Sequence, residues 1–278
     1  MLTSAEGSFV YPYFPSNFMK KALLLLCFTG SAAIAQHTEG TITYSQKTAM
    51  RGRVQIADPA MQARMPESVT TGYQLMFTAD EALYEPTVDD EPAGPGGGPA
   101  FRFNRPRTEI YSKIRERKRV ELRDVFGDLY RIEDTLRSQR WKIGSETKTI
   151  KGIECRKATF SDSSSAQMLT FGGPMPAPQG QQPAQAKRSR TVVAWYAPEI
   201  PVSIGPDRYA GLPGLILEVD VNEGEMVTTV TEIDWKKPKS SELKQPKGGK
   251  AVTQTEFQDI MRQKMQQMNG ERRVRIGG

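Results

Sequence analysis

Apolar and polar residues alternate with a period of two along most of the chain between residues 40 and 234. This period places successive side chains on opposite faces of a sheet, so it predicts half-buried β-strands. We expect strands over 40–46, 71–78, 108–114, 119–125, 129–134, 140–144, 154–160, 167–171, 191–197, 215–221 and 226–234. Short strands separated by turn residues favour an antiparallel meander. The charged stretch 113–124 also fits a helix, and that alternative stays open here.

Two segments have helical spacing instead. Asp58 is a suitable N-cap for a short helix over 58–65, and Thr255 is predicted to cap a longer one over 256–268. The apolar face of the longer helix consists of Phe257, Met261, Met265 and Met268. A methionine stripe of this kind is more typical of packing against a sheet than of a soft-metal site.

Two segments rich in proline and glycine, 85–106 and 172–187, interrupt the alternation. Their composition offers little apolar surface to bury, so we expect mobile inserts. The runs on either side of each insert read as neighbouring strands. This arrangement predicts long hairpin insertions within one domain that covers residues 36–278, and not linkers between domains.

The first 35 residues have the pattern of a secretory signal. A positive Met19-Lys20-Lys21 precedes a short apolar run over 22–28, and Ala33-Ile34-Ala35 has the small-x-small pattern of a cleavage site. We therefore interpret 1–35 as a non-native start followed by a signal peptide that is cleaved after Ala35. No later stretch is long enough to span a bilayer, so the expected location is the periplasm, with peripheral membrane contact left open.

Composition narrows the chemistry that the chain can perform. The formal net charge is +6 over 278 residues and is spread along the sequence, with no nucleic-acid-binding module. The single histidine, His37, falls in an expected frayed terminus, which argues against histidine-based nucleophiles and histidine-rich zinc sites. We expect no cofactor and no metal. An envelope hydrolase built on paired carboxylates remains the enzymatic alternative.

Cys155 would be the only cysteine after signal cleavage, which excludes an intrachain disulfide. The neighbouring Arg156 and Lys157 could lower its thiol pKa and make it a candidate reactive thiol. The favoured interpretation is a small apolar side chain that points into the sheet beside Ile153.

The most informative stretch is Tyr209-Ala210-Gly211-Leu212-Pro213-Gly214-Leu215-Ile216-Leu217. Proline followed by glycine predicts a type II turn. The turn opens into a predicted strand whose Leu215, Leu217, Val219 and Val221 would share one face. A sharp corner that feeds a half-buried strand explains this composition without any chemistry.

The same letters resemble the signature of the GLPGLI family, an exported envelope family of unknown function. Further blocks occur in the order of that family: Trp141-Lys142-Ile143, then Lys151-Gly152-Ile153-Glu154-Cys155-Arg156-Lys157-Ala158, then Ala194-Trp195-Tyr196-Ala197-Pro198. The resemblance covers roughly 140–221 and implies export to the periplasm, often with association to outer-membrane TonB-dependent receptors. It implies no catalytic residues.

These observations predict a mainly β (α+β) fold: a single curved antiparallel sheet or half-open barrel with one or two packed helices, similar by analogy to bacterial lipoprotein carriers. The predicted function is a non-enzymatic module that binds a hydrophobic ligand or docks on an outer-membrane receptor; a purely structural protein is a further alternative. The candidate binding motif consists of Trp195, Tyr196, Tyr209, Gly211, Leu212, Pro213, Gly214, Leu215 and Ile216.

Overall fold

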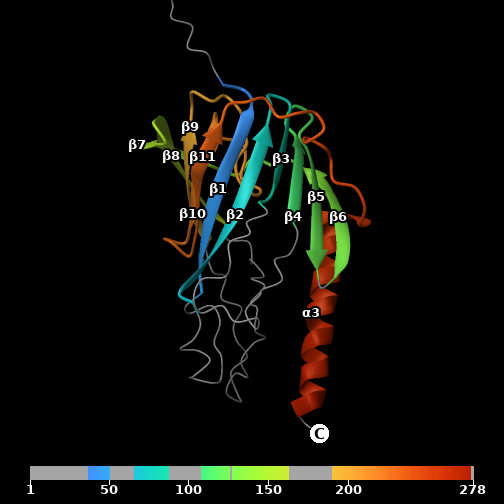
Figure 1. The fold of residues 1–278 in the computed structure, drawn as a ribbon. Helices are drawn as coiled ribbons and strands as arrows, with labels where there is room; N and C mark the ends of the chain where they lie inside the picture. The colour runs from blue at the N-terminus through green and yellow to red at the C-terminus, as the bar shows by residue number, and fades with distance from the viewer. Residues whose placement is uncertain (1–36, 51–65, 88–107, 126, 163–189, 277–278) are drawn as a thin grey trace, which may run out of the picture. The chain divides into compact units, whose positions relative to one another are not determined.

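The computed structural model describes residues 37–50, 66–87, 108–125, 127–162 and 190–276. Within these residues twelve strands lie side by side in one sheet, in the order β12-β6-β5-β4-β3-β2-β1-β11-β10-β9-β8-β7 (Figure 1). The first six are β1 (Gly40–Ala49), β2 (Ser68–Phe77), β3 (Glu81–Pro86), β4 (Thr108–Lys113), β5 (Lys118–Val125) and β6 (Asp128–Thr135). The others are β7 (Lys142–Ile150), β8 (Ile153–Asp162), β9 (Arg190–Ala197), β10 (Leu215–Val221), β11 (Met226–Asp234) and β12 (Lys250–Thr253). The helix of the described residues is α3 (Gln254–Ile276).

The sheet consists of two antiparallel meanders, β1–β6 and β7–β11, which are joined where β1 pairs with β11. The last strand, β12, adds to β6 in parallel, so the sheet is mixed and not wholly antiparallel as predicted. The predicted fold class, mainly β with one large sheet, is confirmed. The sheet is not closed into a barrel, because β7 and β12 remain at its two ends.

A short connection shows that the sheet is strongly curled. β6 ends at Thr135 and β7 begins at Lys142, yet ten strand spacings separate them in the sheet order. Seven residues of extended chain span at most about 25 Å. In a flat sheet the two strands would lie about 48 Å apart at about 4.8 Å per spacing. The two meanders must therefore curve toward each other and enclose a common interior.

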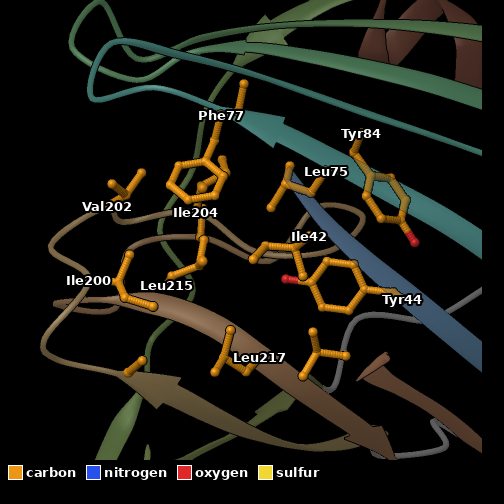
Figure 2. Close-up of a cluster of buried hydrophobic side chains, with 14 of the residues drawn as sticks. Ile42, Tyr44, Leu75, Phe77, Tyr84, Ile200, Val202, Ile204, Leu215 and Leu217 are labelled. Atoms are coloured by element: carbon orange, nitrogen blue, oxygen red, sulfur yellow. The ribbon is translucent and has the colours of Figure 1, made fainter. Parts of the chain in front are cut away.

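The interior contains the main hydrophobic core (Figure 2). Ile42 and Tyr44 of β1 and Leu75 and Phe77 of β2 are fully buried there, opposite Leu215 and Leu217 of β10. The Tyr44 hydroxyl donates a hydrogen bond of 2.7 Å to the Ile216 carbonyl. This bond satisfies a buried polar group and ties the first meander to the second.

A β-bulge changes the faces of β10. The pairing of β10 with β9 shifts register between Ile216 and Glu218. As a result Leu215 and Leu217 pack in the main core, whereas Val219 and Val221 pack in a second cluster with Ala194 and Tyr196. The prediction that the four β10 residues share one face was therefore wrong, because a bulge inserts an extra residue and breaks the period of two.

Two strands escaped the sequence pattern. β3 holds Ala82, Leu83 and Tyr84 in an unbroken apolar run, because Leu83 packs in an outer cluster with Leu243 while its neighbours face the main core. Glu85 and Pro86 belong to β3 and not to the predicted insert. β12 was missed because it is short and charged. The helical alternative for 113–124 was wrong, since these residues end β4 and form most of β5.

Several predictions fall outside the described residues. They are the signal peptide over 1–35, the helix over 58–65, the strand over 167–171, the remainder of the first insert and the whole of the second insert.

Helix α3 begins at a capping box that the sequence analysis placed two residues late. The Glu256 N–H donates to Thr253 Oγ1 at 3.2 Å, and the Thr253 N–H donates to Glu256 Oε2 at 2.7 Å. Thr253, and not Thr255, is therefore the N-cap. Phe257 and Met261 are buried against Tyr130, Ile132 and Val252 of β6 and β12. The helix continues to Ile276, beyond the predicted end. The side chains of Met265 and Met268 lie outside the described residues.

Candidate functional site

The segment between β9 and β10, residues 198–214, folds into the space between the two meanders. Its Ile200, Val202 and Ile204 are buried beside Ile42 and Phe77 (Figure 2). The segment also bonds to the start of β10. The Leu215 N–H donates to the Ile200 carbonyl and the Ile216 N–H to the Ile204 carbonyl, each at 3.0 Å. This segment of the chain, residues 198–214, is called the motif loop below; it fills the interior that the curled sheet encloses.

The second half of this loop is held by the connection between β6 and β7. Gln139 accepts a hydrogen bond of 3.0 Å from the Ala210 N–H and donates one of 2.9 Å to the Arg208 carbonyl. Trp141 Nε1 donates to the Ala210 carbonyl at 2.9 Å. The tryptophan of one motif block is thus bound directly to the backbone of another. This contact joins two segments that lie 69 residues apart in the sequence.

Two glycines of the motif meet steric demands that no other residue satisfies. Gly211 has φ +88°, and a Cβ there would lie 2.0 Å from Ser138 Oγ. A Cβ on Gly214 would lie 2.2 Å from the Ala197 carbonyl oxygen. The predicted type II turn is absent at Pro213: the Gly214 N–H donates to the Leu212 carbonyl at 2.8 Å, which closes a three-residue γ-turn. Close packing, and not the positive φ of a type II turn, selects glycine at 214.

The aromatic residues of the motif lie in different parts of the fold. Tyr196 and Tyr209 are buried with Leu212 and Ile216 in the second cluster, and the Tyr209 hydroxyl accepts a hydrogen bond of 2.8 Å from Arg190. Burial raises the pKa of Tyr209 above its ordinary value. Trp195 lies on the other face of β9, half-buried against the main core. The motif residues therefore belong to two packing clusters and do not converge on one open cleft.

Trp195 is covered by a charged pair. Lys148 Nζ lies 4.5 Å from the centre of the Trp195 ring and 2.6 Å from Glu218 Oε1. A cation over the ring face is attracted by the negative potential of the π-system. Trp195 thus carries its own cationic partner within the fold.

Cys155 is a buried free thiol in the main core. Burial raises its pKa to about 11, because the thiolate would be poorly solvated there. A thiol in this state is a weak nucleophile. The structure therefore places Cys155 among apolar neighbours and not at a reactive surface position.

A buried charged cluster was missed by the sequence analysis. We define it as the arginine cluster, formed by Arg119, Glu121 and Arg123 of β5, Asp134 of β6 and Arg208 of the motif loop. Arg208 lies 2.8 Å from Glu121 Oε1, Arg123 contacts the same oxygen, and Arg119 lies 3.1 Å from Asp134. Glu121 is only 1% exposed. Through the pair of Arg208 and Glu121, the cluster joins the loop to β5 of the first meander.

The protonation state of Glu121 follows from these contacts. Burial works against ionisation, but the attractions of Arg123 and Arg208 outweigh it, and the pKa of Glu121 is held below its usual value. Glu121 is therefore a carboxylate at neutral pH. A carboxyl group held in this state is unsuited to the role of a general acid.

The sequence pattern of β5 does not distinguish this cluster from an exposed charged face. In β5 the charged Arg119, Glu121 and Arg123 alternate with the apolar Val120 and Leu122. Such alternation ordinarily indicates a solvated charged face. Here both faces are covered, because Val120 and Leu122 are buried as well.

The remaining predicted features are placed as follows. His37 is not frayed: its ring stacks on Trp235 with the centroids 4.1 Å apart. Among the described residues, no three His, Cys, Asp or Glu side chains converge as a metal ion would require. None of the described helices is long and apolar enough to cross a membrane.

Comparisons with known proteins bear on one segment of the chain and on its fold. A family model described as "Protein of unknown function (Porph_ging)" matches residues 141–218. The chain resembles "Structure of PNGF-II in C2 space group" with a TM-score of 0.50 at 15% identity, over 80% of this chain and 32% of that chain. "Structure of PNGF-II in P21 space group" gives a TM-score of 0.47 at 15% identity, over 80% and 33%. The chain thus spans about a third of these structures. No curated protein matches it.

Proposed function

We propose that this chain is a non-enzymatic module of the periplasm that docks on an outer-membrane TonB-dependent receptor. The signal-like first 35 residues and the ordered blocks that resemble the GLPGLI family support export. The match of residues 141–218 to a family of unknown function is compatible with that assignment.

One observation carries the choice of docking over carriage of a hydrophobic ligand. A carrier with a curled sheet holds its ligand in the enclosed apolar interior. In this chain Ile200, Val202 and Ile204 of the motif loop occupy that interior and pack between β1, β2 and β10. Because protein interiors are closely packed, these side chains occupy the space that a hydrophobic ligand would need.

The free edge of β7 offers a place for docking. Among the described strands β7 is the last of the sheet, and seven of its nine residues are exposed. Ile143 is a large apolar residue that is 54% exposed. Exposed cations precede it at Arg140 and Lys142, and a third, Lys151, follows the other end of the strand. An extended acidic segment of the receptor could therefore add to β7 as a further strand, with backbone hydrogen bonds and charge complementarity supplying the affinity.

Site-specific photo-crosslinking tests this proposal. A benzoylphenylalanine at Ile143 is expected to crosslink to a TonB-dependent receptor in the native periplasm, and Ile143→Lys is expected to weaken the association. The matched control carries the same crosslinker at Glu223, in the exposed turn between β10 and β11. Equal crosslinking at both sites, or no receptor at Ile143, would contradict docking at β7.

Native mass spectrometry tests the alternative. Protein purified from its own periplasm is expected to have only the mass of the mature chain. A discrete additional mass that denaturation releases would favour ligand carriage and would overturn the proposed function.

A further inference from the structure

The connection between β11 and β12 carries a dense group of positive side chains. We define residues 235–250 as the basic strap. Its charged side chains are one glutamate, Glu242, and six lysines: Lys236, Lys237, Lys239, Lys244, Lys247 and Lys250. All six lysines are exposed. The whole chain has a formal net charge of +6, so a surplus of five positive charges within this one segment is an exception to the spread of charge along the sequence.

The strap is fixed to the body of the protein along its length. Pro238, Leu243 and Pro246 are buried, and Leu243 packs in the outer cluster with side chains of β2, β3 and β4. Near the end of the strap, Arg131 of β6 donates a hydrogen bond of 3.5 Å to the Gly248 carbonyl. Because the buried positions are turned toward the sheet, the lysines between them lie on the solvent side. The strap therefore presents its charges without first having to be ordered.

The strap crosses the outer face of the first meander (Figure 1). It begins after β11, which is next to β1, and it ends at β12, which is next to β6. The lysines are therefore distributed along an extended line and do not surround one point. A free ion would meet only one or two of them, whereas an extended anionic surface would meet several together.

Most of this charge is not neutralised within the fold. Lys237 pairs with Glu39 at 2.9 Å, and Lys239 pairs with Glu242 at 3.7 Å. The strap lysines that form no ion pair within the part of the chain that the structure describes are Lys236, Lys244, Lys247 and Lys250. These four ammonium groups are free to interact with a partner outside the molecule.

We propose that the basic strap binds the surface of an anionic membrane, with its lysines against the phosphate groups of the phospholipids. Lysine clusters of this size are attracted to such surfaces, and each ammonium adds to the attraction. The strap has no exposed large apolar side chain, so it binds at the surface without insertion, and salt weakens the attraction.

The composition of the strap favours a membrane over a nucleic acid. The strap contains no arginine, the residue whose planar fork most often reads base edges. Its one aromatic residue, Trp235, is already stacked on His37 and is not a free platform for a base. The strap lies outside β7, so this inference does not depend on receptor docking at that strand.

Co-sedimentation of the whole chain with lipid vesicles tests the proposal. We expect the parent to bind vesicles made of equal parts of phosphatidylglycerol and phosphatidylcholine, to leave pure phosphatidylcholine vesicles unbound, and to dissociate at high salt. The triple variant Lys236→Gln, Lys244→Gln and Lys247→Gln should bind at least about tenfold more weakly, because each lysine near an anionic surface contributes a factor of about five.

The matched control removes the same charge elsewhere on the surface. Its changes are Lys47→Gln, Lys142→Gln and Lys151→Gln, at exposed lysines of β1, β7 and the turn after β7. This variant should bind the vesicles like the parent. Equal losses in the two triple variants would show that net charge and not the strap is responsible, and would overturn the proposal.

Two further outcomes would also overturn it. One is the absence of binding by the parent to the anionic vesicles. The other is tighter binding of a duplex DNA oligonucleotide or of polyglutamate than of vesicles at the same salt concentration, with loss of that binding in the strap variant. That result would assign the strap to a nucleic acid or to an acidic protein instead. The vesicles contain no receptor, so either failure leaves docking at β7 to its own crosslinking test.

Discussion

Replacement of Glu121 by glutamine should loosen the motif loop and destabilise the whole fold. The substitution keeps the shape of the side chain but removes the charge that Arg123 and Arg208 share. Three buried or partly buried guanidiniums then face one another with only Asp134 and the more distant Asp207 to balance them. The loop loses its ionic contact with β5, while its apolar contacts in the main core remain.

The magnitude follows from burial. Removal of one partner of a buried ion pair costs about 3–5 kcal/mol, mostly because the other charge stays buried and unpaired. Solvent screens Arg208 and Arg123 in part, since their side chains are 32% and 23% exposed. We therefore expect Glu121→Gln to lower the free energy of unfolding by about 3 kcal/mol. In urea this moves the midpoint by about 1 M for an m-value of about 3 kcal/mol/M.

A double-mutant cycle with Arg208→Met isolates the pair from other effects of either change. The two substitutions should be non-additive by more than about 1 kcal/mol, because the second removes a charge that the first has already left unpaired. The exposed pair of Arg262 and Asp259 is the control and should be additive. The reasoning would be refuted if Glu121→Gln lowered the free energy of unfolding by less than about 1 kcal/mol, or if the changes at Glu121 and Arg208 were additive. The cluster would then contribute no more to stability than a surface ion pair.

The pH dependence gives an independent check of the same charge. The pKa of Glu121 is lower in the folded protein than in the unfolded chain. Its contribution is therefore fully present above the unfolded value and is lost as the pH falls through the folded value. The parent should lose stability more steeply than Glu121→Gln below about pH 4.5. Parallel pH profiles would contradict the assignment.

Three further changes test other parts of the structure. Gly211→Ala should lower the free energy of unfolding by about 3 kcal/mol, because the new Cβ combines a positive φ with a clash at Ser138. Gly152→Ala, where φ is also positive but the Cβ meets open space, should lower it by about 1 kcal/mol. Equal losses of stability in urea unfolding would contradict the clash. Thr253→Ala should lower the free energy of unfolding by about 1 kcal/mol because the N-cap hydrogen bond is lost, whereas Thr255→Ala should leave it almost unchanged. A larger loss for Thr255→Ala would favour Thr255 as the N-cap, as the sequence predicted. Cys155 should resist Ellman's reagent at pH 8 until urea unfolds the chain, and rapid labelling of the folded protein would contradict its burial.

Period-two alternation predicted most strands correctly because most strands have one face in a core and the other in a less apolar setting. It failed where both faces are covered. β3 shows an unbroken apolar run, and β5 shows charges on a face that is nevertheless buried. A buried charge needs partners from elsewhere in the fold, here Arg208 at 87 residues' separation. Local pattern carries no information about such a partner, so the arginine cluster could not be predicted.

The motif itself was located from sequence, but its role required the fold. Pro213 and Gly214 suggested a standard turn, whereas the structure uses glycine for close approach to Ala197. Trp141 lies about seventy residues before Ala210, and only the crossover between β6 and β7 brings them together. The sequence therefore located the residues that form the turn before β10, but it did not indicate what these residues contact.

The segment that matches the family model is not a self-sufficient unit of the fold. Residues 141–218 contain β7–β9, the motif loop and the first four residues of β10. The main core that buries Ile200, Ile204 and Leu215 takes its other half from β1–β4. Arg208 likewise finds its partner, Glu121, on β5. The matched segment thus supplies a loop whose apolar and ionic contacts are both completed by the first meander. A change in β1–β5 therefore acts on the motif as directly as a change within it.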